Sequence, residues 1–354
     1  MAKTARYLRR HIGTTVIGSF SESELTRPVG RARHARSRLG VAARWGWLAL
    51  TYCLLGAPAM AQQLAFSQHT AADEVVFSYR YRDFERTEQS LDFRLPAREV
   101  EAAMRAFRDY SLGGLNQHIE TAIAEAARKA GVTVNFSVAA DGSRSVNFRG
   151  PSDRVERLER AMPDVLERAR TDYLGRYWRR HEGDYVYIDY AAAVRQAMPA
   201  MRPLATAFAR RSPGQDERAI LQRALSFLQT IPYDELTEVR RFGGVDFAPA
   251  AAMLKINAGD CDSKSVAIAA LVKLMLPERA VIIVRSRPAG LRVEHALAMA
   301  DLAPREGDAT LRFDGRLFVA LEASGPDQAA VGVVDDRIGE QLRRGEVIAV
   351  AVGR

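Results

Sequence analysis

The chain has 354 residues, of which 47% are apolar and 27% charged, so it is neither disordered throughout nor a fibrous repeat. Its formal net charge of +8 comes entirely from residues 1–61, which contain ten Lys or Arg and two acids. Residues 62–354 carry equal numbers of acids and bases, so the composition gives no support for nucleic-acid binding.

Residues 1–61 have the pattern of a signal peptide. Arginine-rich sequence up to Arg44 is followed by a short apolar run over 45–56 and by Ala59-Met60-Ala61, a small-residue cleavage site. The run is well below the ~20 apolar residues that cross a bilayer. We therefore expect a periplasmic protein with no stable membrane insertion after cleavage. An inner-membrane anchor is the alternative.

Residues 62–180 are expected to form a small α+β domain. Its first residues, 62–73, look like a loose leader, and the alternating charges of 153–160 indicate a solvated helix face. Period-two and helical patterns predict strands at 74–82, 90–95, 132–138 and 145–149, a turn at 140–142, and helices at 98–107, 115–130 and 152–173. No catalytic motif is found here, which favours an inhibitory pro-region or a substrate-recruiting domain.

Residues 181–216 are expected to link this domain to a catalytic domain over 217–354. An aromatic strand at 185–190 either joins the halves or covers a cleft, and 191–211 is helical. Within 217–354 the pattern predicts helices at 217–230 and 261–276, strands at 280–285, 293–299 and 316–321, a turn at 287–290, and a polar hairpin over 301–315.

Gly259-Asp260-Cys261-Asp262 stands at the start of the apolar helix. Gly259 allows a tight turn and Asp260 is a good helix N-cap, so Cys261 lies in the first helical turn. Free N–H groups and the helix dipole favour its thiolate, the nucleophilic form. Cleavage of the signal removes Cys53, the other cysteine, and leaves Cys261 alone in an oxidising compartment. We interpret Cys261 as a nucleophile; a small buried core residue is the alternative.

His295 is the expected general base. It begins an apolar strand 34 residues after Cys261, and adjacent strands can bring both residues to one end of a sheet. The base needs an acceptor that fixes its tautomer, and Glu322, at the end of the next strand, is our choice. Asp301 and Asp314 are the competing acids.

These residues resemble the core of bacterial transglutaminase-like proteins, a superfamily related to papain-like cysteine proteases. The resemblance covers about residues 217–330 and also includes the segment Phe227–Tyr233 before the nucleophile. It implies a transglutaminase-like fold, in which a cysteine-bearing helix packs on an antiparallel sheet. In such a core the Cys261 N–H and the Gln229 side chain are candidate oxyanion donors.

The expected function is therefore an exported cysteine hydrolase, a protease or amidase, or a transamidase. It would act on peptide or isopeptide bonds of the cell envelope through a Cys261-His295-Glu322 triad and a thioester. The sequence has no zinc motif, no cysteine pair and no glycine-rich phosphate loop, so we expect neither metal nor cofactor. The alternative is a non-catalytic periplasmic binding or assembly protein that retains the fold.

Overall fold

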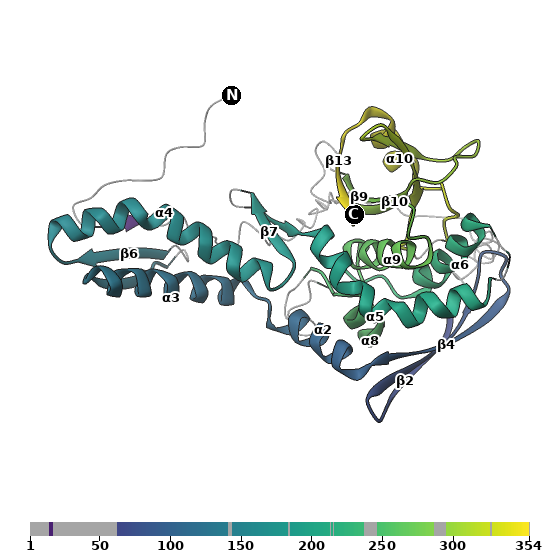
Figure 1. The fold of residues 1–354 in the computed structure, drawn as a ribbon, viewed down its shortest axis with the longest axis horizontal. Helices are drawn as coiled ribbons and strands as arrows, with labels where there is room; N and C mark the ends of the chain where they lie inside the picture. Colours follow the sequence, from purple (N-terminus) through teal and green to yellow (C-terminus); the bar gives the residue numbers. More distant parts are fainter. Residues whose placement is uncertain are drawn as a thin grey trace, which may run out of the picture. The chain divides into compact units, whose positions relative to one another are not determined.

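The structure, a computed structural model, describes residues 14–16, 62–140, 144–182, 185–212, 214, 216–236, 246–286, 295–325 and 328–353. It confirms the α+β class: helices pack with antiparallel sheets, one of which curls into a half-barrel (Figure 1). Most of the predicted signal segment, most of the 140–142 turn and the whole 287–290 turn lie outside the described residues.

The chain divides into two compact units, and the described part of the first consists of Thr14–Val16 and residues 124–140 and 144–161. Its antiparallel sheet has the strand order β1 (Thr14–Val16), β6 (Arg144–Arg149), β5 (Thr133–Val138). The β5–β6 hairpin confirms the prediction. The helices α3 (Leu112–Ala130) and α4 (Ser152–Gly175) each have residues in both units.

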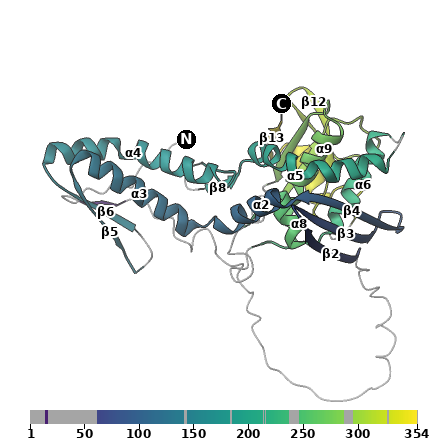
Figure 2. The same cartoon turned by 60° about the horizontal axis from the view of Figure 1, so that its bottom comes forward.

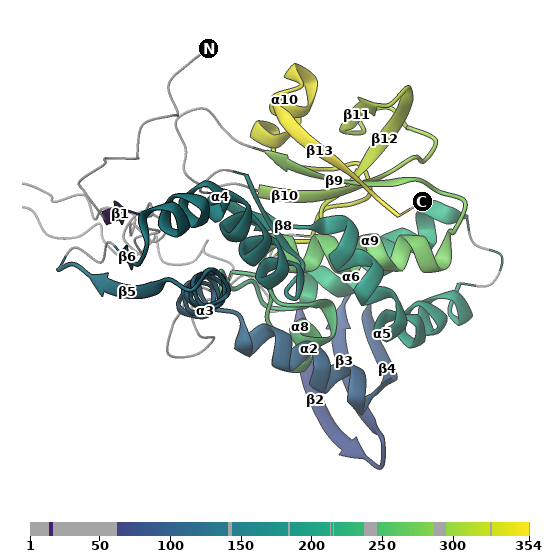
Figure 3. The ribbon, with the colours of Figure 1, turned by 60° about the vertical axis from the view of Figure 1, so that its left-hand side comes forward.

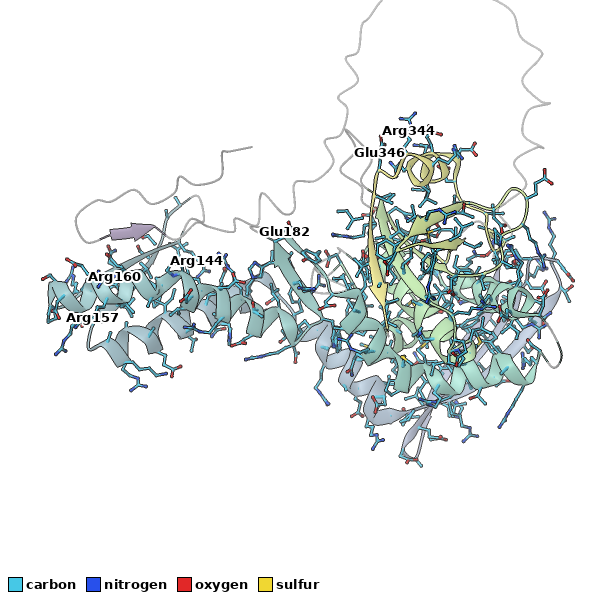
Figure 4. The ribbon with its side chains drawn as sticks, turned by 45° about the horizontal axis from the view of Figure 1, so that its top comes forward. Arg144, Arg157, Arg160, Glu182, Arg344 and Glu346 are labelled. Atoms are coloured by element: carbon cyan, nitrogen blue, oxygen red, sulfur yellow. The ribbon has the colours of Figure 1, made fainter. Side chains whose placement is uncertain are left out.

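The alternating charges of α4 form a solvated face, as predicted. Arg157 pairs with Asp153 at 2.7 Å and Arg160 pairs with Glu156 at 3.9 Å, each one helical turn apart. All four side chains are more than half exposed, and Figure 4 shows both arginines pointing away from the helix. Solvent screens such pairs, so they add little to stability.

The second unit begins with the antiparallel sheet β2 (Gln63–Ala71), β3 (Glu74–Arg82), β4 (Glu88–Pro96), whose strands lie side by side in Figure 2. The prediction of a loose leader at 62–73 was wrong, because most of that segment is β2. The strand was missed because it lies at an edge and its residues are exposed or half-buried, which leaves little apolar alternation to detect. The helix α2 (Ala97–Asp109) follows directly.

This sheet shares a core with later helices. The Tyr79 ring of β3 lies edge-on to Phe227 of α6 (Glu217–Thr230) with 4.9 Å between ring centroids, and its hydroxyl donates to the Leu254 carbonyl of α8 (Ala250–Ile256). The compact units therefore divide the chain differently from the domain boundaries expected at 180 and 216. Deleting residues 62–180 would remove part of this core, which disfavours a separable pro-region.

Between the sheets runs α9 (Cys261–Met275), with α5 (Tyr190–Arg210) and α8 on one side and strands β9 and β10 on the other (Figure 3). Its residues are buried on all faces from Ser263 to Val272, which explains its nearly continuous apolar sequence. A two-stranded sheet, β7 (Arg179–Glu182) and β8 (Tyr185–Ile188), precedes α5.

The half-barrel sheet contains the strands in the order β11-β12-β10-β9-β13, all antiparallel to their neighbours. Its strands are β9 (Val281–Ser286), β10 (His295–Ala300), β11 (Thr310–Phe313), β12 (Arg316–Leu321) and β13 (Val347–Val352). On one face Leu297 and Met299 join a core that includes Leu342 of α10 (Asp336–Arg344). The alternate residues of β10 are alanines, and these small side chains allow α9 to approach closely.

Candidate functional site

Cys261 is the first residue of α9, as predicted. The Asp260 carboxylate caps the helix by accepting a hydrogen bond from the Ser263 N–H at 2.8 Å. A Cβ atom at Gly259 would lie 2.7 Å from the Met253 side chain, so a larger residue there would require that side chain to shift. The turn and the cap together fix the tip of α9.

Two groups hydrogen-bond the Cys261 sulfur: the backbone N–H of Ala296 and the phenol of Tyr233. Ser265, one turn along α9, donates its hydroxyl to the Ala296 carbonyl at 3.1 Å. The helix therefore holds both backbone groups of Ala296, and the sulfur lies at the beginning of β10, against the residue that follows His295. Cys261 is 7% exposed.

His295 begins β10 and pairs with Glu322 at the end of β12, with 2.7 Å between Nε2 and Oε2. The other carboxylate oxygen accepts from the Ser324 N–H at 2.8 Å. Because an ionised carboxylate only accepts, Nε2 carries the hydrogen and Nδ1 is left as the proton acceptor. Burial disfavours charge on both side chains, but their hydrogen bond and opposite charges outweigh it. The pKa of His295 is raised and the pKa of Glu322 is lowered.

The competing acids have other structural roles. Asp301 accepts from the Ala280 N–H at 2.7 Å and pairs with Arg316 at 3.0 Å, while Asp314 lies in the β11–β12 turn with φ 46°. Of the three acids considered, Glu322 is the one that contacts His295.

Gln229 does not have the geometry of an oxyanion donor. It is 2% exposed, and its amide nitrogen already donates to the carbonyls of Glu322 and Ala329. Both amide hydrogens are therefore used, and the side chain braces the segment that follows β12.

The pKa of Cys261 is shifted in the direction opposite to the one expected from its position on the helix. Burial raises the pKa of the thiol well above its usual value, and the nearby carboxylates of Asp262 and Asp260 add to this effect. The hydrogen bond from Ala296 offsets part of it. The sulfur is therefore a neutral thiol near pH 7, and attack needs a base that accepts its proton.

Lys264 is fully buried one helical turn after Cys261. Its ammonium donates to the carbonyls of Ile231, at 2.6 Å, and Ser324, at 2.5 Å. It thereby ties the end of α6 to the segment that carries Glu322. Burial lowers the pKa of Lys264 to about 7, although nearby acids oppose the shift.

Sequence reasoning missed Tyr233 and Lys264 as parts of the site. Tyr233 belonged to the recognised segment before the nucleophile, but only its bridge to Gly259 shows that it meets the sulfur. Lys264 could have been noticed as a charged residue directly before a long apolar run in the same helix, because a buried lysine must find acceptors.

These contacts define a histidine-glutamate pair in an α+β protein, with the buried Cys261 packed against Ala296, the residue after His295. Comparison of the chain with family models, with curated proteins and with solved structures found no match. Within the described ranges, no group of three or more His, Cys, Asp or Glu is placed to hold a metal ion. None of the helices described is both long and apolar enough to cross a membrane.

Proposed function

We propose that the protein is a cysteine-dependent enzyme that cleaves or transfers acyl groups at amide bonds, with the transglutaminase-like core that the sequence resembles. One observation carries the proposal: His295, oriented by Glu322 at 2.7 Å, immediately precedes the residue whose N–H hydrogen-bonds the Cys261 sulfur. A nucleophile, a base and an orienting acid then belong to one connected cluster.

The proposed reaction has two halves. In the first, Nδ1 of His295 accepts the thiol proton as the Cys261 sulfur attacks the amide carbonyl. A thioester forms, the C–N bond breaks, and the imidazolium returns the proton to the leaving amine. In the second, His295 accepts a proton from water or another amine as it attacks the thioester. The C–S bond breaks, the acyl group leaves as an acid or a new amide, and His295 returns the proton to the Cys261 sulfur. Hydrolysis is the default outcome, which makes the protein a protease or amidase.

The negative oxygen of the tetrahedral intermediate needs hydrogen-bond donors. The N–H of Cys261 is suited to this role because the first N–H groups of a helix have no intrahelical acceptor. The Tyr233 phenol, which reaches the sulfur, is the second donor. Burial and neighbouring anionic groups raise the pKa of Tyr233, so the phenol keeps its proton at physiological pH.

The proposed substrate is a peptide or isopeptide of the cell envelope, because the N-terminal pattern indicates export. We test the function by incubating envelope peptides with the wild-type protein and with the Cys261→Ala and His295→Ala variants. Products identified by mass should appear with the wild type and be absent or strongly reduced with both variants. Equal products from all three proteins would refute a cysteine-dependent reaction.

The alternative, a non-catalytic binding protein, is favoured by the low exposure of Cys261 and by the raised pKa of its thiol. The two functions differ in how substrate peptides protect Cys261 from alkylation by iodoacetamide. An enzyme should form a thioester that protects Cys261 from alkylation, and His295→Ala should abolish this protection. A binding protein should show the same protection in both proteins.

A further inference from the structure

A polar cavity of about 80 Å³ adjoins His295 in the second unit. Strand β8 supplies one wall through Val186, Tyr187 and Ile188, and the start of α9 and the ends of β9 and β10 supply another. The charged residues that line it are Arg179, Arg285, Asp246, Asp262 and His295. Strand β8 of the aromatic segment thus lines a cleft, the second of the two roles considered for it from the sequence.

The cavity carries fixed charges of both signs. Arg179, whose side chain is 4% exposed, pairs with Asp246 at 2.8 Å, and its buried Nε has no hydrogen-bond partner in the structure. Arg285 lies over the Tyr187 ring at 4.9 Å from its centroid. Asp262 accepts from the Tyr190 hydroxyl and is influenced by both guanidinium groups. Apart from His295, the two guanidinium groups therefore balance the two carboxylates around the cavity.

We propose that this cavity binds a zwitterionic α-amino carboxylate, that is, an amino-acid centre whose amine and carboxylate are both unblocked. A cavity whose charges sum to zero gains little from a ligand of a single sign, whereas a ligand with both signs can pair with guanidinium and carboxylate groups together. Arg179 and Arg285 supply guanidinium groups for the ligand carboxylate, and Asp246 and Asp262 supply carboxylates for its amine.

The position of the cavity assigns the unblocked α-amino carboxylate to the amine side of the scissile bond. This assignment rests on the proposed function. His295 must protonate the leaving amine, so the substituents of that amine lie beside His295, where the cavity opens. An amine-side residue keeps both α-groups free only when it is a diamino acid joined through its side-chain amine. The substrate class is then an isopeptide rather than a linear peptide.

Binding can be tested without turnover on the Cys261→Ala protein by NMR titration. The probe is Nε-acetyl-L-lysine, compared with its Nα-acetylated form, its α-carboxamide form and N-pentylacetamide, which lacks both the α-amine and the carboxylate. We expect the zwitterion to bind and each block to weaken binding roughly tenfold or more, since each removes charge-assisted hydrogen bonds. Equal binding after either block would indicate a carboxylate site or an amine site only, and absence of binding would equally overturn the proposal.

Variants connect the ligand to the cavity. Asp246→Asn, at a carboxylate that is 66% exposed, should weaken zwitterion binding and leave the Nα-acetylated probe unaffected. Arg285→Gln should weaken binding of every probe that has a carboxylate. The control is Arg312→Gln, which removes an exposed guanidinium from β11 and should leave binding unchanged. Equal effects of the cavity and control variants would refute the assignment.

Kinetics separates this inference from the proposed function. The wild-type protein could cleave amides without preferring those that have an unblocked α-amino carboxylate on the amine side. That result would support the proposed function and refute the binding of a zwitterion in the cavity. Zwitterion binding without cleavage of any amide would retain the binding site and lose the enzymatic proposal.

Discussion

Replacement of Lys264 by Met should remove a specific pH dependence from the stability of the second unit. The ammonium group is fully buried, and its pKa of about 7 lies far below the 10.5 of an ordinary lysine. That difference corresponds to roughly 5 kcal/mol of disfavoured charge in the folded state.

The sign follows from proton uptake on unfolding. Between pH 7 and about 10 the unfolded chain holds a proton on Lys264 that the folded protein has released, so the free energy of unfolding rises with pH. Over the interval from pH 7 to 9, this residue should contribute roughly 2 kcal/mol of added stability. In Lys264→Met that increase should be absent. The variant also leaves the carbonyls of Ile231 and Ser324 without their donor, at about 1–3 kcal/mol each at every pH.

The assay is urea denaturation at pH 7, 8 and 9, followed by the fluorescence of Trp178, the only tryptophan in residues 62–354. Trp178 belongs to the same unit as Lys264. All proteins should carry Cys261→Ala, because the raised thiol pKa makes stability fall as pH rises and would mask the effect. Lys129→Met, at a lysine whose side chain is 67% exposed, is the control.

The difference in pH slope between the two lysine variants is the decisive quantity. A Lys264→Met protein whose stability rises with pH as steeply as that of its parent would show that Lys264 is not buried with a lowered pKa. The account of how the segment carrying Glu322 is held in place would then also fail.

Glu322→Gln should lower the pKa of His295, as measured by NMR of the ring protons, because the imidazolium loses its counter-charge. The same variant should reduce the proposed turnover by roughly 10²–10⁴-fold. An unchanged His295 pKa would contradict the pairing of His295 with Glu322. Gln229→Leu should destabilise the fold by about 2–4 kcal/mol in thermal or urea denaturation, since two buried carbonyls lose their donors. A stable Gln229→Leu protein with impaired turnover would instead restore Gln229 as an oxyanion donor. Tyr233→Ala should speed alkylation of Cys261 several-fold, because it uncovers the sulfur. Tyr233→Phe keeps the aromatic ring and should keep the slow alkylation rate. Equal rates in the two variants would contradict the conclusion that the Tyr233 ring covers the sulfur.

Local sequence patterns predicted many of the elements that surround the site. The predicted limits of β3, α6 and β12 agree with the structure, because their alternation or helical periodicity is uninterrupted and turn residues bound them. The elements not predicted are β1, β2, β7, β11, α8, α10 and β13. Strands β2 and β11 lie at sheet edges and their residues are exposed or half-buried, so their apolar alternation is weak.

The His295–Glu322 contact was predicted from chain order because neighbouring antiparallel strands bring their ends together. The role of Gln229 could not be predicted in this way. Whether a buried amide faces a substrate or a backbone carbonyl depends on the path of residues 322–330, and no local pattern specifies that path. The domain boundaries are a similar case, because the contact of Tyr79 with Phe227 joins residues 148 positions apart.

Several titrations overlap around Cys261, so the pH dependence of the site belongs to the cluster. The pKa of Asp262 is about 6 and that of Lys264 about 7, while that of His295 is raised from 6.5. Protonation of any of these groups changes the field at the sulfur, because Asp262 raises the pKa of the thiol. A bell-shaped rate profile would therefore report macroscopic constants of the cluster rather than of His295. The pH–rate profiles of the wild type and Lys264→Met separate the contribution of Lys264 from that of the triad. An alkaline limb that moves in this variant originates outside the triad. An alkaline limb that stays fixed reflects the reacting residues.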